Sequence, residues 1–373
     1  MVLIFIFSLI SVSAAFSEKG PWIASIEKSG ESIVFADHSE SLTEGGWILL
    51  SGGKEIQLPQ PLTFTYYGAS SLKKGGTTVE FMSEATEGNN TELSFTYPYS
   101  THPFYTEGQK VTMNFNGPST FNKQDVNIYL VKGINPRCAE EAFRDLICDE
   151  NVSLEEAFNK STGSYTKICA TLDKKGDLPE PVTFDSLKPG SYGILITLAD
   201  NEKAKEKSCS EKQILSATGF EVVNYELNAD AADTLEEGED LEVDLSLKGA
   251  PANGIYTYGA ILVKKEAYKA DINFTSNGTK AGTDVYINDI GIVRDLGFNS
   301  TNYDSKFTRS EVTKDIQTLI GEGNGTISIG EKDQDTLCLT TLDLLPGDYL
   351  LFTGAYEKGK GLVGIDQDKL KIK

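Results

Sequence analysis

A pattern that occurs twice along this chain constrains its fold more than any other feature. Each copy begins with a Glu-Gly turn, at residues 107–108 and again at 237–238, and continues into a strand in which apolar and polar residues alternate. Side chains of a β-strand alternate between its two faces, so the apolar residues of each strand share one face. These residues are Val111, Met113 and Phe115 in the first copy, and Leu241, Val243 and Leu245 in the second. A second apolar strand follows in each copy, over residues 126–132 and 258–264.

The second half of the pattern is a Leu-x-Pro-Gly-x-Tyr hexapeptide, at residues 187–192 and 344–349, each followed by an apolar strand. Pro and Gly favour a tight turn, and the tyrosine then starts the next strand with its ring in the core. Its hydroxyl is free to bond the nearby backbone, as in the tyrosine corner of immunoglobulin-like sandwiches. We therefore expect Tyr192 and Tyr349 to be tyrosine corners of two tandem immunoglobulin-like β-sandwiches.

Each copy carries a helical pattern between its second strand and its corner. In the first copy, residues 136–147 have an apolar stripe at helical spacing, and residues 153–156 resemble a capping box. In the second copy, Ser310 is a candidate cap for a helix that buries Val312, Ile316, Leu319 and Ile320 and stops at Gly321. We expect these helices to pack over an open end of each sandwich; the alternative is that they shape a binding surface.

The segment before the first copy reads as short strands separated by turn residues. The strands are expected at residues 32–35, 47–51, 55–58, 62–66 and 77–82. The predicted fold is thus mainly β: tandem immunoglobulin-like β-sandwiches with short helical inserts, preceded by a small N-terminal β module. The expected boundaries are residues 1–15 for a signal peptide, 16–88 for the N-terminal module, 89–223 for the first sandwich and 224–373 for the second.

The N-terminal residues have the pattern of an export signal. Residues 2–10 are apolar apart from Ser8, and the small residues 11–15 that follow suit a cleavage site after Ala14 or Ala15. The run is too short to span a bilayer, although no Lys or Arg follows Met1; a buried strand is the alternative. No second long apolar segment occurs, so we expect a product that is secreted or held in the cell envelope, with no membrane span in the mature chain.

Two further features agree with export. Seven Asn-x-Ser/Thr motifs are candidate glycosylation sites: Asn89, Asn151, Asn159, Asn273, Asn277, Asn299 and Asn324. Four of the five cysteines fall within the first sandwich and its insert and are candidates for two disulfides: Cys138, Cys148, Cys169 and Cys209. On one continuous helix, Cys138 and Cys148 would lie about 15 Å apart, too far to bridge, so each would pair with Cys169 or Cys209. Cys338 is expected to be a lone thiol near the core.

Composition and charge exclude several classes of partner and chemistry. The net charge of −21, from 55 acidic and 34 basic residues, would repel nucleic acid and anionic membranes. The only histidines, His38 and His102, are far apart, and the chain has no metal-binding spacing, nucleophile elbow, phosphate loop or dinucleotide fingerprint. We therefore predict a protein that is not an enzyme and needs no cofactor or metal. A carboxylate pair of the glycosidase type stays open, because no pair stands out among so many acids.

Two clusters deserve a binding hypothesis beside a structural one. The acidic stretch at residues 230–244 lacks the Asp-x-Asp-x-Asp-Gly loop of a calcium site, and alternation places Glu242 and Asp244 on the outer face of a strand. The aspartate pairs at residues 333/335 and 366/368 are equally weak candidates. Four aromatic residues could stack on a sugar, although packing in a core or between domains is the favoured interpretation: Trp22, Trp47, Tyr97 and Tyr99.

Several segments resemble a family of extracellular proteins from methanogenic archaea. They are Gly-Pro-Trp-Ile-Ala at residues 20–24, Pro-Leu-Thr-Phe-Thr-Tyr at 61–66, and the stretches 234–239, 254–260, 318–330 and 346–358. The resemblance spans nearly the whole mature chain and implies an archaeal envelope setting, where acidic, glycosylated surface proteins are usual. It implies no enzymatic activity. Many relatives end in a sorting or membrane-spanning tail that this sequence lacks, and an anaerobic habitat weakens the disulfide hypothesis.

The sequence as a whole predicts a non-enzymatic exported protein of the cell envelope, with a structural or interaction role carried by tandem sandwiches. Its expected partners are other envelope proteins or surface glycans, and not nucleic acid. The alternative is a glycan- or peptide-binding module that uses the helical inserts and the N-terminal aromatic residues. A carboxylate-based hydrolase is the remote alternative.

Overall fold

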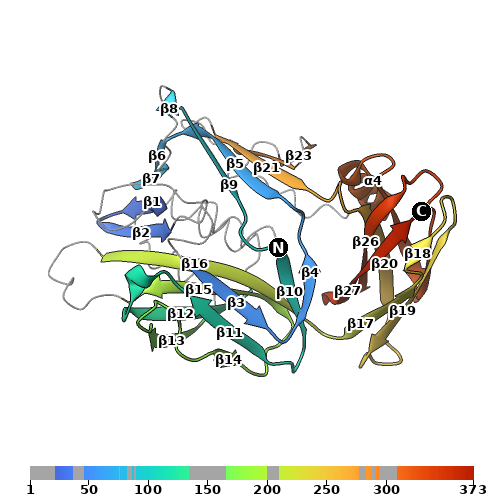
Figure 1. Ribbon diagram of the computed structural model, residues 1–373, viewed down its shortest axis with the longest axis horizontal. Helices are drawn as coiled ribbons and strands as arrows, with labels where there is room; N and C mark the ends of the chain where they lie inside the picture. Colours follow the sequence, from blue (N-terminus) through green and yellow to red (C-terminus); the bar gives the residue numbers. More distant parts are fainter. Residues whose placement is uncertain are drawn as a thin grey trace.

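The computed structural model describes residues 22–36, 46–74, 76–81, 86–87, 90–133, 165–199, 210–276, 283–287, 290–293 and 309–373. The fold is mainly β, as predicted (Figure 1). Within these ranges the chain forms five sheets, the α-helix α4 (Arg309–Ile320) and the short 3-10 helix η1 (Ser119–Phe121).

The second copy of the repeat forms a two-layer sandwich. Its smaller sheet has the order β17 (Glu226–Ala231), β19 (Leu241–Lys248) and β25 (Thr336–Leu339). Its larger sheet has the order β18 (Thr234–Leu235), β27 (Gly361–Ile372), β26 (Gly347–Glu357), β20 (Tyr256–Lys264) and β24 (Gly325–Lys332). Leu241, Val243 and Leu245 lie in the core between the sheets, which also holds Tyr349. The alternation in the sequence therefore gave the buried face of this strand correctly.

The first copy forms a sandwich of the same kind. Its smaller sheet has the order β14 (Val182–Phe184), β11 (Val111–Asn116) and β3 (Trp47–Ser51). Its larger sheet contains β13 (Tyr165–Thr171), β12 (Asp125–Lys132), β15 (Gly190–Leu198) and β16 (Ser210–Val223), with β10 (Thr101–Thr106) paired to β16. Val111, Met113 and Phe115 lie in its core beside Tyr192.

The strand pairing shows that the two sandwiches are duplicates. Seven strands of the first have counterparts in the second: β3–β11–β14 corresponds to β17–β19–β25, and β13–β12–β15–β16 corresponds to β24–β20–β26–β27. A parallel pair also recurs, since β10 runs parallel to β16 and β18 runs parallel to β27. This arrangement of two facing sheets is compatible with the β-sandwich class. In both copies the insert leaves the sandwich at the same point, between β12 and β13 and between β20 and β24.

The strands of the predicted N-terminal module are hydrogen-bonded into sheets with later strands. Residues 22–81 contain β1 (Trp22–Lys28), β2 (Glu31–Ala36), β4 (Lys54–Gln57), β6 (Ser71–Lys74) and β7 (Thr77–Phe81) besides β3 and β5 (Leu62–Ala69). β2 pairs in parallel with the first half of β16 and so extends the larger sheet of the first sandwich through β1, β7 and β6. β3 completes the smaller sheet, and β4 pairs with β10.

A further sheet is built from both halves of the chain. Its order is β23 (Ile290–Val293), β22 (Thr283–Ile287), β21 (Ala270–Ser276), β5 (Leu62–Ala69), β9 (Asn90–Thr96) and β8 (Thr86–Glu87). β21 belongs to the insert of the second sandwich, yet it runs parallel to β5 from Ala270 opposite Leu62 to Ser276 opposite Gly68. We call this the shared sheet. In Figure 1 it bridges the two sandwiches along one side of the molecule.

The two sandwiches also meet directly, at a contact that we call the junction. Ile56 and Phe104 of the first half pack with Val223, Phe352 and Ile365 in one apolar cluster. The Lys54 ammonium donates to the carbonyl oxygen of Leu227 at 2.9 Å and forms an ion pair with Asp366 at 2.8 Å. The backbone amide of Gln57 donates to Gln367 Oε1 at 2.9 Å, and Tyr268 Oη donates to the carbonyl oxygen of Gln57 at 3.0 Å. Apolar packing and hydrogen bonds together hold the sandwiches in a fixed relation.

Candidate functional site

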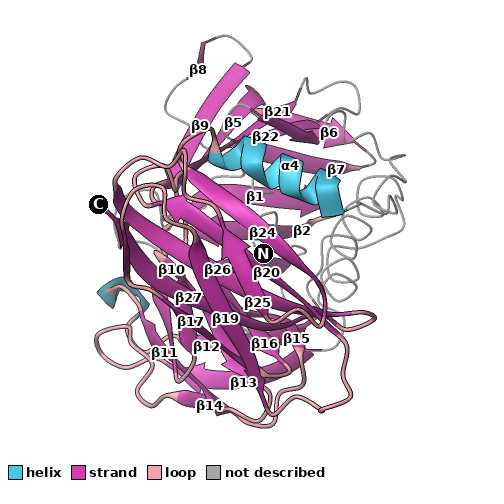
Figure 2. Cartoon of the chain, turned by 90° about the vertical axis from the view of Figure 1, so that its right-hand side faces the viewer, coloured by secondary structure: helices cyan, strands magenta, loops and turns pink. Residues whose placement is uncertain are grey.

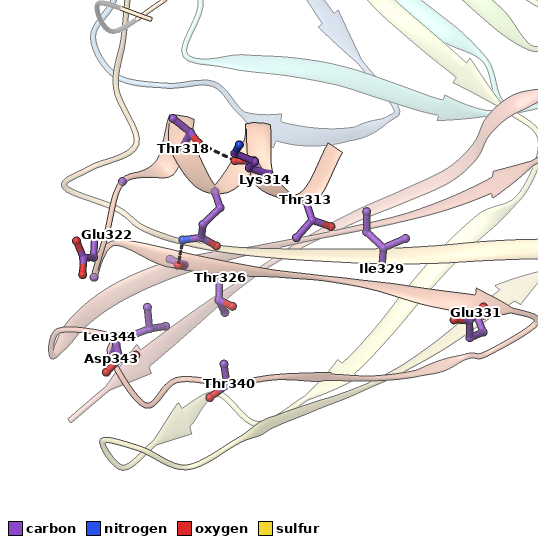
Figure 3. A pocket seen from close by; sticks show the side chains of 14 residues that line it. Thr313, Lys314, Thr318, Glu322, Thr326, Ile329, Glu331, Thr340, Asp343 and Leu344 are labelled. Carbon is purple, nitrogen blue, oxygen red and sulfur yellow. Dashed lines mark hydrogen bonds between the residues drawn. The ribbon is translucent and has the colours of Figure 1, made fainter. Parts of the chain in front are cut away.

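One pocket lies on the second sandwich, where its insert returns to the sheet. Helix α4, strand β24 and the turn between β25 and β26 border an open pocket with a volume of about 1040 Å³, which we call the groove (Figure 3). The lining side chains and glycines come from these three elements: Thr313, Lys314, Gln317, Thr318, Gly321, Glu322, Gly323, Gly325, Thr326, Ile329, Glu331, Thr340, Asp343 and Leu344.

Glycines shape the turn that carries α4 into β24. Gly321 ends the helix with φ of +84° and Gly323 has φ of +74°, both in the left-handed region that favours glycine. Gly325 permits a close approach, because a Cβ atom there would lie 2.1 Å from the carbonyl oxygen of Leu262. Gln317 Nε2 donates to the carbonyl oxygen of Gly325 at 2.9 Å and ties the helix to the strand.

The helix itself matches the sequence prediction, with a small shift at its start. It begins at Arg309, so Ser310 lies within its first turn and does not precede it as a cap. Ile316, Leu319 and Ile320 are partly buried, and Gly321 follows the last helical residue as predicted. The helix packs on β24, at the side of the sandwich (Figure 2), and its residues Thr313, Lys314, Gln317 and Thr318 line the groove.

The described lining of the groove is mostly polar. Among the described residues that line it, four are threonines, three are the exposed acids Glu322, Glu331 and Asp343, and Lys314 is basic. Figure 3 shows Glu322 and Asp343 near one end and Glu331 near the other. Leu342 and Leu345, on the turn that forms one wall, are 68% and 54% exposed. The described lining thus offers hydrogen-bonding side chains over an extended length.

The predicted tyrosine corners make equivalent hydrogen bonds. Tyr192 Oη donates to the carbonyl oxygen of Lys188 at 2.7 Å, and Tyr349 Oη donates to that of Leu345 at 2.6 Å. Both rings are buried, and Tyr192 stacks on Phe220 with their ring centroids 5.2 Å apart. Burial raises the pKa of Tyr349, so its hydroxyl remains a donor at neutral pH. Each corner anchors the start of a central strand of the larger sheet, β15 or β26.

Three of the four aromatic candidates come together. Trp47 and Tyr99 meet edge to face with ring centroids 5.2 Å apart, and Tyr97 lies 5.3 Å from Tyr99. Tyr99 Oη accepts a hydrogen bond from the backbone amide of Ile48 at 3.1 Å, and burial raises the pKa of Tyr97 and Tyr99. These partly buried rings pack the first sandwich against the segment that follows β9. Trp22 lies at the start of β1.

Two of the glycosylation candidates are described. Asn273 lies within β21, with a partly buried side chain, and Asn324 lies in the turn between α4 and β24, beside the groove. The other five candidates lie outside the described residues: Asn89, Asn151, Asn159, Asn277 and Asn299.

The cysteines differ from expectation at one position. Cys338 was expected near the core, but its thiol is exposed on β25, because Leu337 and Leu339 occupy the inward positions of the alternating strand. Cys169 carries an exposed free thiol on β13 that lies 3.5 Å from Asn127 Oδ1. The remaining disulfide candidates, Cys138, Cys148 and Cys209, lie outside the described residues, so the pairing stays a prediction.

Histidine and carboxylate chemistry has no obvious centre in the described part of the chain. His102 is 5% exposed in β10, and burial lowers its pKa to about 4; His38 lies outside the described residues. Asp244 faces outward, as predicted, and accepts a hydrogen bond from Thr336 Oγ1 at 2.6 Å. Among the described residues, no three His, Cys, Asp or Glu side chains are grouped to hold a metal ion. No helix in this part of the chain is long and apolar enough to cross a membrane.

Sequence reasoning did not identify the groove or the junction. The glycines at 321, 323 and 325 are the one local signal, because they mark a tight return between the helix and the next strand. Nothing near Lys54 or Asp366 in the sequence indicates that they pair across the two halves. No protein-family model matches this chain, and comparison with curated proteins gives no significant match.

Proposed function

We propose that this chain is a non-enzymatic protein exported to the cell envelope, where the two sandwiches work as one rigid interaction unit. The observation that carries the proposal is the shared sheet, in which β5 of the first half pairs with β21 of the second along its length. With the junction, it gives two independent connections between the sandwiches. Two domains joined in this way can hold binding surfaces at a fixed spacing, unlike domains on a flexible linker.

The acidic composition and the sequence resemblance support the envelope setting. A net charge of −21 keeps a surface protein hydrated and disfavours nucleic acid and anionic lipid as partners. The resemblance to extracellular proteins of methanogenic archaea points the same way. Other envelope proteins or surface glycans are the partners that such a unit would contact.

The second candidate function is a binding module for a peptide or a glycan. The groove favours it, because it is large, open and lined with hydrogen-bonding side chains. This candidate is compatible with the first, since a rigid envelope protein needs at least one contact surface.

Fractionation of native cells combined with mild chemical cross-linking tests the proposal. We expect the protein in the envelope fraction and cross-linked to a second envelope component. A location in the cytosol would refute the envelope role. Hydrolysis of a polysaccharide by the purified protein would refute the non-enzymatic role.

A further inference from the structure

We propose that a second copy of this chain docks on the outer face of the larger sheet of the second sandwich, and that two copies form a symmetric dimer through this face. Three observations carry the inference: exposed apolar side chains beside a hollow of glycines, the continuity of the face with the junction, and its low charge. The inference goes beyond the proposed function, because it does not depend on where the protein is located.

A pair of glycines forms a hollow in this face. Tyr258 of β20 and Ala355 of β26 lie in the core, so the neighbouring Gly259 and Gly354 are on the outer side of the sheet. They lie directly opposite each other, and both are partly exposed. Among the described residues, the atoms nearest to a Cβ atom built on Gly259 belong to the adjacent strand β24, at 3.8 and 4.0 Å. A side chain from outside can therefore approach the backbone here.

The next row along the strands is a ridge of side chains. Thr257 lies opposite Tyr356, and Tyr356 lies opposite Leu362 of β27. Tyr356 is 50% exposed and Leu362 is 47% exposed, and Ile255, which precedes β20, is 49% exposed. Exposed apolar side chains that gather in one patch are typical of an interaction surface, whereas single ones are not.

A ridge beside a hollow on one face is self-complementary. In a twofold dimer the same patch of both copies meets, so that residue i contacts residue j and j contacts i. The twofold axis of this dimer lies between the two faces, parallel to the rows and midway between them, which places each Tyr356 over the glycines of the other copy. The two rows are about 7 Å apart along the strands, and facing sheets pack about 10 Å apart. One aromatic side chain fills that space when the facing residue is glycine.

The same face already binds the first half of the chain at the junction. Phe352 is the outward residue of β26 before Gly354, and Ile365 of β27 lies opposite Gly354. Phe352 and Ile365 pack in the apolar cluster of the junction. The hollow thus lies where the covered part of the face ends, and the ridge continues the same apolar surface into solvent.

Low charge allows a second copy to approach this face. Residues 250–263 contain no charged residue. Residues 349–364 contain Glu357, Lys358 and Lys360, a net charge of +1, and Glu357 is paired with Lys360 at 3.0 Å. Two copies of a chain with a net charge of −21 repel each other, and the repulsion is weakest where the surface carries no excess of acids.

Sedimentation equilibrium of the full chain tests the inference. We expect a concentration-dependent dimer with a Kd between about 10 μM and 1 mM, since this patch is smaller than the 800 Å² or so per partner that stable complexes bury. Raising the salt from about 50 mM to about 500 mM should tighten the dimer, because salt screens the repulsion between two acidic copies.

Matched variants locate the contact. Tyr356→Ala removes the ridge and Gly259→Leu fills the hollow, and each should weaken the dimer at least about tenfold. Tyr67→Ala is the control, because this tyrosine is 43% exposed on β5, outside the patch, and should leave the Kd unchanged. Circular dichroism and the urea midpoint show that each variant is folded.

Mixing the two variants tests the symmetric arrangement. In a mixed dimer, Tyr356 of the Gly259→Leu chain meets the intact glycines of the Tyr356→Ala chain. The leucine that replaces Gly259 then faces the alanine that replaces Tyr356, so one contact is restored and the clash is absent. We expect the mixed pair to bind about tenfold more tightly than either variant binds itself, measured by fluorescence anisotropy with a label on one chain.

Four results would overturn the inference. The first is a wild-type chain that stays monomeric up to about 1 mM. The second is a dimer that tolerates both Tyr356→Ala and Gly259→Leu, and the third is a mixed pair that binds no better than the separate variants. The fourth is a monomeric chain that binds cellohexaose through Tyr356, because it would assign the ridge to a glycan. Each leaves the fractionation result intact, so the proposed function and this inference fail separately.

Discussion

Replacing the two corner tyrosines with phenylalanine measures how strongly the duplicated turn stabilises each sandwich. Tyr349→Phe removes the hydrogen bond of 2.6 Å to the carbonyl oxygen of Leu345, and Tyr192→Phe removes the bond of 2.7 Å to that of Lys188. Both rings stay buried in the cores, so the substitution deletes one oxygen atom and leaves the apolar packing in place.

The expected loss of stability depends on whether water can reach the two carbonyl oxygens that lose their hydrogen-bond donor. A net hydrogen bond between neutral groups contributes about 1 kcal/mol, and a buried acceptor left without a partner costs up to about 3 kcal/mol. Leu345 is 54% exposed, and the side chain of Lys188 is 73% exposed, so water can reach the turns and replace the lost donor. We therefore expect each variant to lose about 1 kcal/mol, near the lower of these limits.

Urea denaturation read by two probes is the assay. The only tryptophans, Trp22 and Trp47, lie on β1 and β3, so tryptophan fluorescence reports on the first half of the chain, whereas far-ultraviolet circular dichroism reports on all strands. A loss of 1 kcal/mol lowers the midpoint by about 0.3–1 M at typical urea slopes. If the junction and the shared sheet make the sandwiches one cooperative unit, Tyr349→Phe shifts the fluorescence transition as much as the dichroism transition.

Tyr356→Phe is the matched control, because this tyrosine is 50% exposed on the same strand, β26. It should leave the midpoint unchanged. Unchanged midpoints in both corner variants would refute the corner argument. A shift in the dichroism transition of Tyr349→Phe with no shift in fluorescence would show that the sandwiches unfold separately and would refute the rigid unit.

Three further perturbations test the junction, a buried histidine and the groove. Lys54→Met removes the ion pair with Asp366 and should cost about 1–2 kcal/mol and separate the two transitions, whereas Lys188→Met at an exposed pair should cost less than about 0.5 kcal/mol by urea denaturation. Burial lowers the pKa of His102 from 6.5 to about 4, so between these pH values the unfolded chain binds more protons than the folded chain. The free energy of unfolding therefore decreases as the pH is lowered, by at most about 1.4 kcal/mol per pH unit. His102→Leu should reduce this pH dependence in unfolding measured from pH 7 to pH 4. Gly325→Ala places a Cβ atom 2.1 Å from the carbonyl oxygen of Leu262 and should cost about 1–3 kcal/mol in the same assay, whereas Gly259→Ala, whose nearest contact is 3.8 Å, should be close to neutral.

The duplicated cores could be predicted because their signals are local. Alternation over a few residues identified which side chains of β11 and β19 are buried, and the Pro-Gly turn located the strands that follow. The strand predicted at residues 47–51 matches β3. The helix of the second insert was found from its apolar spacing and its terminal glycine. Each of these predictions depends only on residues close together in the sequence, so one sequence is enough to make it.

Strand partners could not be predicted, since alternation tells which face is buried but not which strand lies alongside. β5 fits equally well in a separate N-terminal module, yet its parallel partner β21 lies in the insert of the second sandwich. The same limit applies to β3, which completes a sheet with β11 across the intervening residues 52–110. The prediction for Cys338 was wrong for a simpler reason. The sequence places Cys338 in an alternating strand, but the neighbouring Leu337 and Leu339 face the core, so the thiol faces solvent.

The groove escaped detection for a related reason. Its walls come from α4, β24 and the turn after β25, and only the packing of the second sandwich brings them together. The sequence shows an excess of acidic residues, but it does not show that Glu322, Asp343 and Glu331 lie along one groove.

The shared sheet changes what the duplication means for function. A duplicated sandwich with self-contained inserts would give two domains that fold independently and are joined by a linker, so that the sequence of each could change without affecting the other. Here one insert supplies β21 and the other half of the chain supplies β5, so neither strand keeps this pairing if the halves part. Phe64 and Leu62, buried where these strands meet with Ala270, would then be exposed to water, at a cost of about 1.5–3 kcal/mol for each large side chain. This cost opposes separation of the sandwiches and gives the groove on the second a fixed position relative to the first.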